Sequence, residues 1–395
     1  VTGSAPYRAP TNPLEKAVAG VFAELLGTDR VGLDDDFFAL GGNSLLATRA
    51  VARINEALAA DVAVRELFES PTVAELAARV TPGIGTVADR PALTRVERPE
   101  RIPLSLAQQR MWLLNQFDTS SPAYNIPLAI RLDGDLDVSA LRHAVFDVLE
   151  RHESLRTRYP VGPDGTPYQQ ILPVSEVHSG GLEIDTTTDP IGRVTELLTT
   201  GFDVTTEVPV RALLLHTGTD EYLLALVVHH ITGDGASMAP LARDLMTAYM
   251  ARLSGNSPRW SPLQVQYADY AIWQREVIGT DDADDSIAAR QLAYWRTQLA
   301  GLSGELELPA DRPRPAVPSM RGAATGFVVA PETHRALDRL AREHGATLFM
   351  VVHAAVAVLL ARLTGESDIA VGTPIAGRGE RALDDLVGMF VNTLA

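Results

Sequence analysis

Two histidines, a carboxylate and two glycines lie within seven residues, in the segment HHITGDG from His229 to Gly235. Histidine titrates near neutral pH, so an accessible imidazole in this segment can accept or donate a proton. Asp234 can hold the backbone of a loop or pair with an arginine, and the glycines can permit a tight turn beneath the histidines. The segment therefore has the residue types that acid and base chemistry at a loop requires.

A metal site and a purely structural role are the alternatives for HHITGDG. Adjacent histidines on a strand point to opposite faces, so His229 and His230 cannot easily bind one ion, and we predict no metal. The structural alternative is a histidine pair that ends a buried strand. The seven residues alone do not decide between this alternative and catalysis.

A second candidate for chemistry is Ser44, which follows two glycines and an asparagine in the segment GGNS. The apolar spacing predicts a helix that begins near Ser44, where free amide hydrogens and the helix dipole would stabilise an anion. No histidine lies nearby in the sequence to activate the hydroxyl, so a phosphodiester on Ser44 is favoured over a hydrolytic role. The alternative is that Ser44 only caps the helix.

The elements that carry Ser44 are predicted to be helical. From residue 12 to residue 80 apolar residues recur at helical spacing, which predicts a compact helical bundle. Ser70 and Pro71 predict the start of its last short helix, as an N-cap followed by a first-turn proline. Prolines, glycines and charges then replace the periodic pattern, so residues 81–101 are predicted to be a linker.

The elements that carry HHITGDG are predicted to alternate between helices and strands, as in α/β domains. Helices are expected over 105–116 and 138–151. The run YLLALVV at 222–228 predicts a strand buried on both faces, which ends at the histidine pair. A loop that follows a buried strand is a common place for chemistry, because the strand fixes the backbone.

A proline-rich break at 308–319 divides this larger part of the chain into two predicted lobes, 102–307 and 308–395. In the second lobe, a helical block is expected over 337–363 and a strand over 369–374.

Length and composition exclude several classes of protein. The chain has 395 residues, enough for two or three folding units. Its 34 basic and 50 acidic residues give a net charge of −16, and the basic residues form no stripe that could follow phosphates, so we expect no nucleic acid partner. Without cysteine, disulfides and thiolate chemistry are excluded. We find no apolar signal core or membrane-length apolar stretch, and expect a cytoplasmic protein without a membrane partner.

Residues 12–80 as a whole, with GGNSL and the preceding pair Phe37 and Phe38, resemble a peptidyl carrier protein of nonribosomal peptide synthetases. Members of that family are small all-α four-helix bundles. The serine of their GG(H/D/N)SL motif carries 4′-phosphopantetheine, whose thiol holds the growing peptide as a thioester. The resemblance implies that Ser44 is the attachment site of this cofactor.

Residues from about 100 to 395 resemble the condensation domain of the same synthetases. Members of that family have an α/β fold of two lobes similar to chloramphenicol acetyltransferase, arranged in a V with a central tunnel. The resemblance implies a multidomain chain that forms amide bonds between two carrier-bound thioesters. It rests on six motifs in the family's order: SLAQQRMWLL (105–114), RHESLRTRY (151–159), HHITGDG (229–235), YADYAIWQ (267–274), GTPIAGR (372–378) and VGMFVNTLA (387–395).

The resemblance implies a role for each polar residue of HHITGDG. The two thioesters meet at the second histidine of the motif, so His230 is expected to position the amine and act as general base. His229 is expected to face away and be buried. Asp234 is expected to be structural and to pair with an arginine, for which Arg378 is our candidate. Gly235 is expected to keep the space beside His230 clear.

The resemblance also implies partners and leaves two alternatives open. The partners are an upstream adenylation domain, a downstream acceptor carrier domain and a phosphopantetheinyl transferase. The alternatives are an epimerase-like HHxxxDG enzyme, against which YADYAIWQ and VGMFVNTLA argue, and a noncatalytic docking module, against which the intact HHITGDG argues. The family continues past VGMFVNTLA, so the second lobe is expected to be incomplete. HHITGDG and GFDVTTEVPVRALL resemble the subtype with D-configured donors, which implies a D-residue or glycine as the donor.

Overall fold

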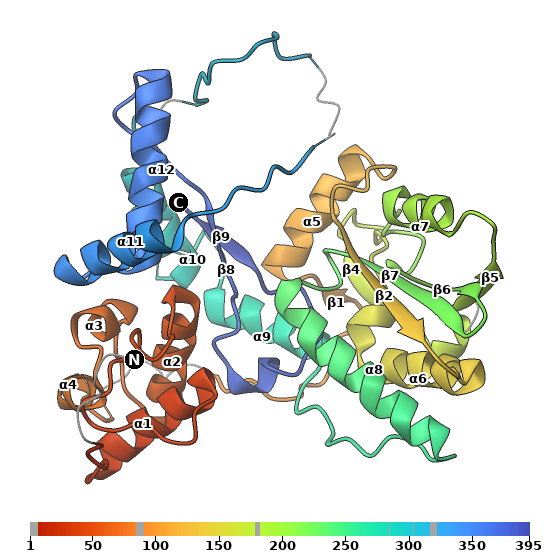
Figure 1. Ribbon diagram of the computed structural model, residues 1–395, viewed down its shortest axis with the longest axis horizontal. Coiled ribbons are helices and arrows are strands. Elements are labelled where there is room, and N and C mark those ends of the chain that lie inside the picture. Colours follow the sequence, from red (N-terminus) through yellow and green to blue (C-terminus); the bar gives the residue numbers. More distant parts are fainter. Residues whose placement is uncertain (1–6, 84–90, 178–181, 284, 303, 317–321) are drawn as a thin grey trace. The chain divides into compact units, whose positions relative to one another are not determined.

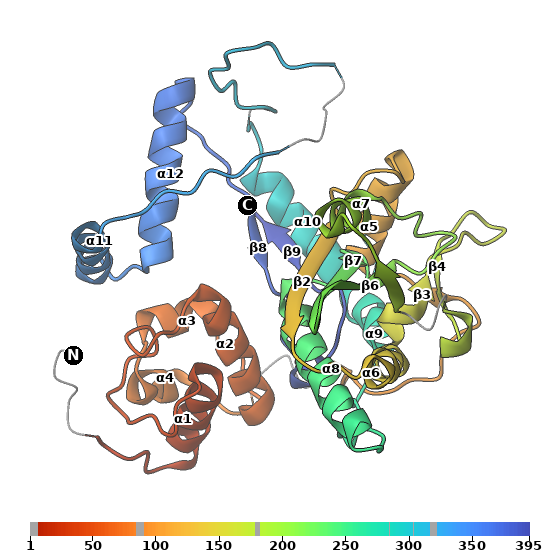
Figure 2. The ribbon, with the colours of Figure 1, turned by 45° about the vertical axis from the view of Figure 1, so that its right-hand side comes forward.

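The computed structural model describes residues 7–83, 91–177, 182–283, 285–302, 304–316 and 322–395, and Figure 1 and Figure 2 show their helices and strands. Contacts within the chain divide it into two units. The first holds residues 1–90, 294–381 and 393–395, and the second holds residues 91–293 and 382–392. Each is described by itself below.

Four helices near the N-terminus form a small bundle, as the sequence predicts. The core contains fully buried apolar residues from the helices and from the loop between the first two, among them Phe22, Phe37 and Leu76. Asn12 and Glu15 form a capping box at the first helix. The helices are α1 (Pro13–Leu26), α2 (Ser44–Leu58), α3 (Val64–Glu69) and α4 (Val73–Arg79).

The predicted start of the last helix in this bundle is wrong by two residues. Ser70 is the C-cap of α3, and the N-cap of α4 is Thr72. The Thr72 hydroxyl accepts a hydrogen bond from the Glu75 amide at 3.3 Å, and the Glu75 carboxylate accepts from Thr72, so the two residues form a capping box. The sequence offers two hydroxyl residues around Pro71, and the capping box with Glu75 selects Thr72.

A four-stranded sheet is the centre of the second unit, and its strand order is β2–β7–β6–β5. Neighbouring strands are antiparallel except β5 and β6, which are parallel. In β7 and β6, alternate residues belong to two different apolar clusters, one on each face of the sheet. The predicted strand that is buried on both faces is therefore confirmed in β7. The strands are β2 (Asn125–Asp133), β5 (Glu183–Thr186), β6 (Val210–Gly218) and β7 (Glu221–His229).

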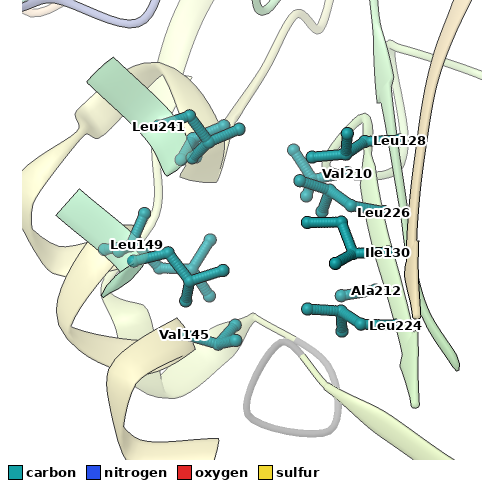
Figure 3. Close-up of a pocket in the computed structure, with 12 residues that line it drawn as sticks. Leu128, Ile130, Val145, Leu149, Val210, Ala212, Leu224, Leu226 and Leu241 are labelled. Carbon is teal, nitrogen blue, oxygen red and sulfur yellow. The ribbon is translucent and has the colours of Figure 1, made fainter. Parts of the chain in front are cut away.

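Helices α6 (Val138–Arg151) and α8 (Met238–Leu253) pack against one face of the sheet. Between them and the strands lies a cavity of about 40 Å³ whose lining is entirely apolar, including Ile130, Leu149 and Leu226 (Figure 3). The other face packs with residues of α5 (Leu106–Phe117) and α7 (Pro190–Thr199). The predicted helices at 105–116 and 138–151 are thus confirmed.

Shorter elements complete the second unit. A small antiparallel sheet has the order β1–β4–β3 and contacts helix α9 (Tyr267–Ile278) through β1. Single-turn helices follow α6, β4 and β7. The strands of the small sheet are β1 (Ile102–Pro103), β3 (Thr157–Arg158) and β4 (Tyr168–Ile171), and the single turns are η2 (Glu153–Arg156), η3 (Val174–Glu176) and η5 (Gly235–Ser237).

The C-terminal part of the chain is mainly helical. The predicted helical block at 337–363 is two helices, because Gly345 adopts a positive φ of 59° between them. The predicted strand at 369–374 is limited to β8, which pairs with β9. The elements are α10 (Ile287–Gln298), α11 (Pro331–Glu343), α12 (Leu348–Thr364), β8 (Thr373–Ile375), η6 (Arg381–Leu383) and β9 (Asn392–Leu394).

Two segments lie in the second unit although the sequence places them elsewhere. Residues 91–101 of the predicted linker are bound to it: the Trp273 indole donates to the Pro91 carbonyl at 2.6 Å, and Arg98 pairs with Asp269 and Glu153. Residues 84–90 of the linker lie outside the described residues. Residues 382–392, called the inserted segment below, also belong to this unit, whereas the residues that flank them belong to the first.

Candidate active site

The HHITGDG segment begins where β7 ends. His229 is the last residue of β7 and lies opposite Asn125, the first residue of β2. His230 leaves the strand, and its backbone amide donates to the Tyr124 carbonyl at 2.8 Å. The buried sheet thereby fixes the start of the loop, which is the placement that the apolar run YLLALVV predicts.

His229 is fully buried, as predicted. Its Nδ1 accepts a hydrogen bond from the Ile231 amide at 3.1 Å, so the proton of the neutral ring lies on Nε2. Burial, with a smaller effect of the neighbouring His230, lowers the pKa of His229 to about 4. His229 is therefore neutral at physiological pH and acts as an acceptor for the backbone of the loop.

His230 is the more exposed of the two histidines, and is half-buried. Within the described part of the chain its Nδ1 atom is buried and has no hydrogen-bond partner. A catalytic triad would place a carboxylate at this atom to orient the ring and stabilise its charged form. Among the residues that the structure describes, no carboxylate therefore binds Nδ1 of His230 as in a triad.

Asp234 is fully buried, and its carboxylate binds backbone and hydroxyl groups. Oδ1 accepts from the Ser237 amide at 2.9 Å and from the Ser237 hydroxyl at 2.8 Å. Oδ2 accepts from the Phe390 amide at 3.1 Å. Asp234 thus has a structural role. Arg378 belongs to the other unit, and its pairing with Asp234 stays a prediction.

The two glycines of the loop differ from the expectation of a glycine-dependent turn. Neither Gly233 nor Gly235 has a positive φ, so the backbone itself is open to other residues. Gly235 is exposed, and a Cβ there would meet no atom within 4 Å. The role of Gly235 in leaving room beside His230 stays a prediction.

The inserted segment binds side chains from four of the sequence motifs, and also Ser237, at five successive backbone positions. Ser154 donates to the Val387 carbonyl at 2.7 Å, and Tyr267 donates to the Met389 carbonyl. Arg110 donates to the Val391 carbonyl at 3.4 Å. Ser237 and Asp234 bind Gly388 and Phe390 respectively. These side chains therefore hold the backbone of the inserted segment.

At the second candidate site, Ser44 is the first residue of α2. The alternative in which Ser44 caps this helix is wrong, because the N-cap is Asn43, whose Oδ1 accepts from the Leu46 amide at 3.0 Å. The side chain of Ser44 lies outside the described residues. In the loop before α2, Phe38 stacks on Phe68 with ring centroids 4.8 Å apart, and Phe37 contacts Phe22 at 4.7 Å. These contacts anchor the loop to the bundle.

Metal and membrane features were sought in the same described ranges. They contain no group of three or more His, Asp or Glu side chains that could hold a metal ion. None of their helices alone is long and apolar enough to cross a membrane. The pair α11 and α12, with a bend of 103° between them, together has the length and composition of a membrane span.

Comparison with protein families identifies the domain that contains HHITGDG. Residues 99–395 match the model of the condensation domain. The chain belongs to the condensation domain family. Residues 16–80 match the model of the phosphopantetheine attachment site, so a carrier domain precedes the condensation domain, as the sequence predicts.

Relatives of the chain are nonribosomal peptide synthetases. It is 49% identical over 391 residues to a dimodular nonribosomal peptide synthase of Bacillus subtilis (strain 168), covering 98% of this chain and 16% of the relative. It is 38% identical over 395 residues to tyrocidine synthase 3 of Brevibacillus parabrevis, covering 100% of this chain and 6% of the relative. The chain thus spans a small part of these proteins.

Solved structures resemble the condensation domain. The crystal structure of the X-domain from teicoplanin biosynthesis is 37% identical with a TM-score of 0.71, over 77% of this chain and 67% of that chain. The X-domain in its complex with OxyB is 36% identical with the same TM-score, over 77% and 66%. The first condensation domain of the calcium-dependent antibiotic synthetase with substrate analogue 2a is 26% identical with a TM-score of 0.55, over 75% and 69%.

Sequence reasoning missed Ser237 and the inserted segment of the condensation domain. Ser237 follows Asp234 by three residues, which is the spacing of a capping pair and was the available signal. The bond between Asp234 and Phe390 joins residues 156 apart, and no local pattern indicates such a pairing.

Proposed function

We propose that the chain forms an amide bond between two carrier-bound thioesters, with Ser44 as the tether of the donor and His230 at the reaction centre. The observation that carries the proposal is the half-buried His230 imidazole, presented by a loop whose Asp234 and Ser237 are both fully buried and hydrogen-bonded. A rigid loop with one accessible polar ring suits the alignment of two substrates.

The reaction needs no co-reactant beyond the two thioesters. The nitrogen of the acceptor amine attacks the thioester carbonyl of the donor, the C–N bond forms and the C–S bond breaks. The proton that the amine loses ends on the sulfur of the donor tether, which leaves as a thiol. An α-amine has a reference pKa of about 8, so a substantial fraction is already neutral and nucleophilic near pH 7.

His230 then has two tasks, to bind the amine and to accept its proton as the tetrahedral intermediate forms. Because the buried Nδ1 of His230 has no partner in the described residues, no carboxylate compensates a long-lived imidazolium. This arrangement favours hydrogen bonding and brief proton transfer over a strongly activated base. Asp234 contributes by holding the loop, and Gly235 by leaving space.

The N-terminus of α2 fits a phosphodiester on Ser44. The first turn of α2 contains no acidic residue, and the first amides of a helix have no partner within the helix itself. The bound 4′-phosphopantetheine would supply the thiol that holds the donor. We further propose that a phosphopantetheinyl transferase modifies Ser44, that an upstream adenylation domain loads it, and that the acceptor is a downstream carrier domain in the cytoplasm, with no nucleic acid or membrane involved.

The test is transfer of a donor group, followed by intact mass. The full-length protein is loaded at Ser44 with acetylglycyl-phosphopantetheine and mixed with a glycyl-loaded acceptor carrier. Glycine is used because it is acceptable to a site for achiral or D-configured donors. We expect the acetylglycyl group to move to the acceptor, and His230→Ala to slow this transfer at least about 100-fold. His143→Ala, at an exposed position, is the matched control and should leave the rate unchanged.

Two results would contradict the proposal. If deuterium from solvent enters the α-carbon of a loaded alanyl donor while no amide forms, the site is epimerase-like. If wild-type protein shows neither transfer nor exchange, catalysis is excluded for these substrates.

A noncatalytic docking module is the second candidate function, and a specific similarity favours it. The solved complex of the X-domain with OxyB shows a chain with this fold bound to another protein. The assay above separates the candidates, since a docking module would give no transfer in the wild-type protein or in the His230→Ala variant.

A further inference from the structure

The hydroxyl of Ser237 joins the HHITGDG loop to the inserted segment. Its Oγ accepts from the Asp234 amide at 3.2 Å and from the Gly388 amide at 3.1 Å. The same Oγ lies 2.8 Å from Asp234 Oδ1 and 3.0 Å from the Gly388 carbonyl oxygen, and its single hydrogen goes to one of these two acceptors. Ser237 is fully buried, so solvent cannot replace these bonds.

The inserted segment is a fixed partner for this hydroxyl. A Cβ at Gly388 would lie 2.0 Å from Cδ2 of Tyr267 and 2.9 Å from Cε2 of Phe390, so the backbone at Gly388 is in close contact with the Tyr267 ring. That ring is itself held, because its hydroxyl binds the Met389 carbonyl and lies 2.8 Å from Ser105 Oγ. Ser237 therefore ties the loop to a segment that has little freedom to shift.

The loop that carries His230 is held at both of its ends. At the start, the amide of His230 binds the Tyr124 carbonyl, and Nδ1 of His229 binds the Ile231 amide. At the end, Asp234 and Ser237 bind the inserted segment, and α8 begins at the next residue, Met238. Since the start belongs to the sheet, the inserted segment acts on the far end of the loop, through the Asp234 carboxylate and the Ser237 hydroxyl.

We infer that Ser237 is a positioning residue for amide bond formation, which acts through the loop from His230 to Asp234 and does not touch the substrate. The inference rests on the proposed function. A displacement of about 1 Å at a reacting group can lower a rate by about 100-fold, so loss of this one hydroxyl is expected to affect turnover more than substrate binding.

Ser237→Ala and Ser154→Ala form a matched pair for the test. Ser154 is also a buried serine whose hydroxyl binds the inserted segment, at the Val387 carbonyl, but it lies in η2 outside the loop. In the acyl transfer assay with full-length protein, we expect Ser237→Ala to lower the single-turnover rate constant about 10 to 100-fold, on the order of the cost of a misplaced reacting group, with less than about a 3-fold change in the acceptor KM. Ser154→Ala should change the rate by less than about 3-fold, although both variants lower the Tm.

Hydrogen exchange measured by mass spectrometry gives a readout that does not depend on turnover. We expect Ser237→Ala to speed exchange in peptides that cover 229–237 and 387–391, and Ser154→Ala to speed it only in the second. If wild-type protein forms no amide, the proposed function fails, while the exchange pattern still decides whether Ser237 fixes the loop. Equal loss of rate in both variants, or unchanged exchange in 229–237, would overturn the inference.

Discussion

Asp234 and His229 each bind backbone amides in or near the loop that carries His230. His229 uses Nδ1 to bind the Ile231 amide, and Asp234 uses Oδ2 to bind the Phe390 amide. Both side chains are fully buried, where an unpaired backbone amide would cost about 1–3 kcal/mol. At the scale of single residues, His229 and Asp234 therefore hold the loop, which is consistent with the proposal that His230 binds the substrate.

The buried state of His229 predicts a pH dependence of stability. The folded state lowers the pKa of His229 from 6.5 to about 4, so below pH 6.5 the unfolded chain binds a proton that the folded chain does not. The contribution of the neutral, buried His229 to the free energy of unfolding is therefore fully present above pH 6.5 and is lost as the pH falls toward 4. Between pH 7 and pH 5 we expect a loss of about 2 kcal/mol in the free energy of unfolding, at about 1.4 kcal/mol per pH unit.

Urea unfolding followed by tryptophan fluorescence checks this prediction. The carrier bundle contains no tryptophan. Trp112, Trp260 and Trp273 lie in the unit with His229, and the fourth tryptophan, Trp295, lies in the other unit and is replaced by Phe in both proteins. In His229→Asn the side-chain oxygen can still accept from the Ile231 amide but does not titrate, so the loss between pH 7 and pH 5 should shrink. His152 contributes in the same direction in both proteins, because burial also lowers its pKa. An equal loss in both would contradict the assignment to His229.

The close approach at Gly388 predicts a strong intolerance of side chains. Because a Cβ there would lie 2.0 Å from Tyr267 Cδ2, Gly388→Ala must displace the ring or the segment, and we expect a loss of about 2–4 kcal/mol in the free energy of unfolding. Gly235→Ala is the matched control, since its Cβ meets open space, and it should cost less than about 1 kcal/mol. Similar costs for the two variants would show that the inserted segment is loosely packed.

At the scale of elements, part of the predicted linker, residues 91–101, is bound to the second unit. Arg98 donates to both oxygens of Asp269, at 3.0 and 3.2 Å, and to Glu153 at 2.8 Å. Asp269 also accepts from the Gln266 amide at the start of α9, so it caps its own helix while it binds Arg98. Residues 91–101 are thereby fixed on α9 and η2. The prolines and charges that predicted a linker indicate exposed side chains, but they do not indicate these contacts.

Removal of Arg98 should destabilise the second unit, because it leaves the buried Asp269 carboxylate without its cation. We expect Arg98→Ala to lower the free energy of unfolding by about 2–4 kcal/mol in urea unfolding followed by tryptophan fluorescence. The control is Arg101→Ala, whose pair with Asp164 is 3.7 Å long and exposed, and which should cost less than about 1 kcal/mol. A small effect of Arg98→Ala would mean that residues 91–101 detach readily.

At the scale of the whole molecule, the order of domains could be predicted from the sequence, because helical periodicity and the six motifs are local or ordered along the chain. The strand before HHITGDG and the helix at 138–151 followed from apolar patterns alone, whereas the burial of His229 was implied by the family resemblance. The N-cap of α4 is Thr72 and not Ser70, because Glu75 forms a capping box with Thr72. The position of residues 382–392 depended on contacts with residues far away in sequence, which no window of the sequence contains.

The long separation between the inserted segment and its partners has a consequence for synthesis on the ribosome. Arg110 binds Val391, which is 281 residues later in the chain, and Ser237 binds Gly388, which is 151 residues later. These bonds can form only after Val391 and Gly388 have been synthesised. The sheet that carries His230 can assemble earlier, since β2, β5, β6 and β7 are all complete once His229 has emerged. The bonds that hold the far end of the loop are therefore completed only after residues 387–391 have emerged.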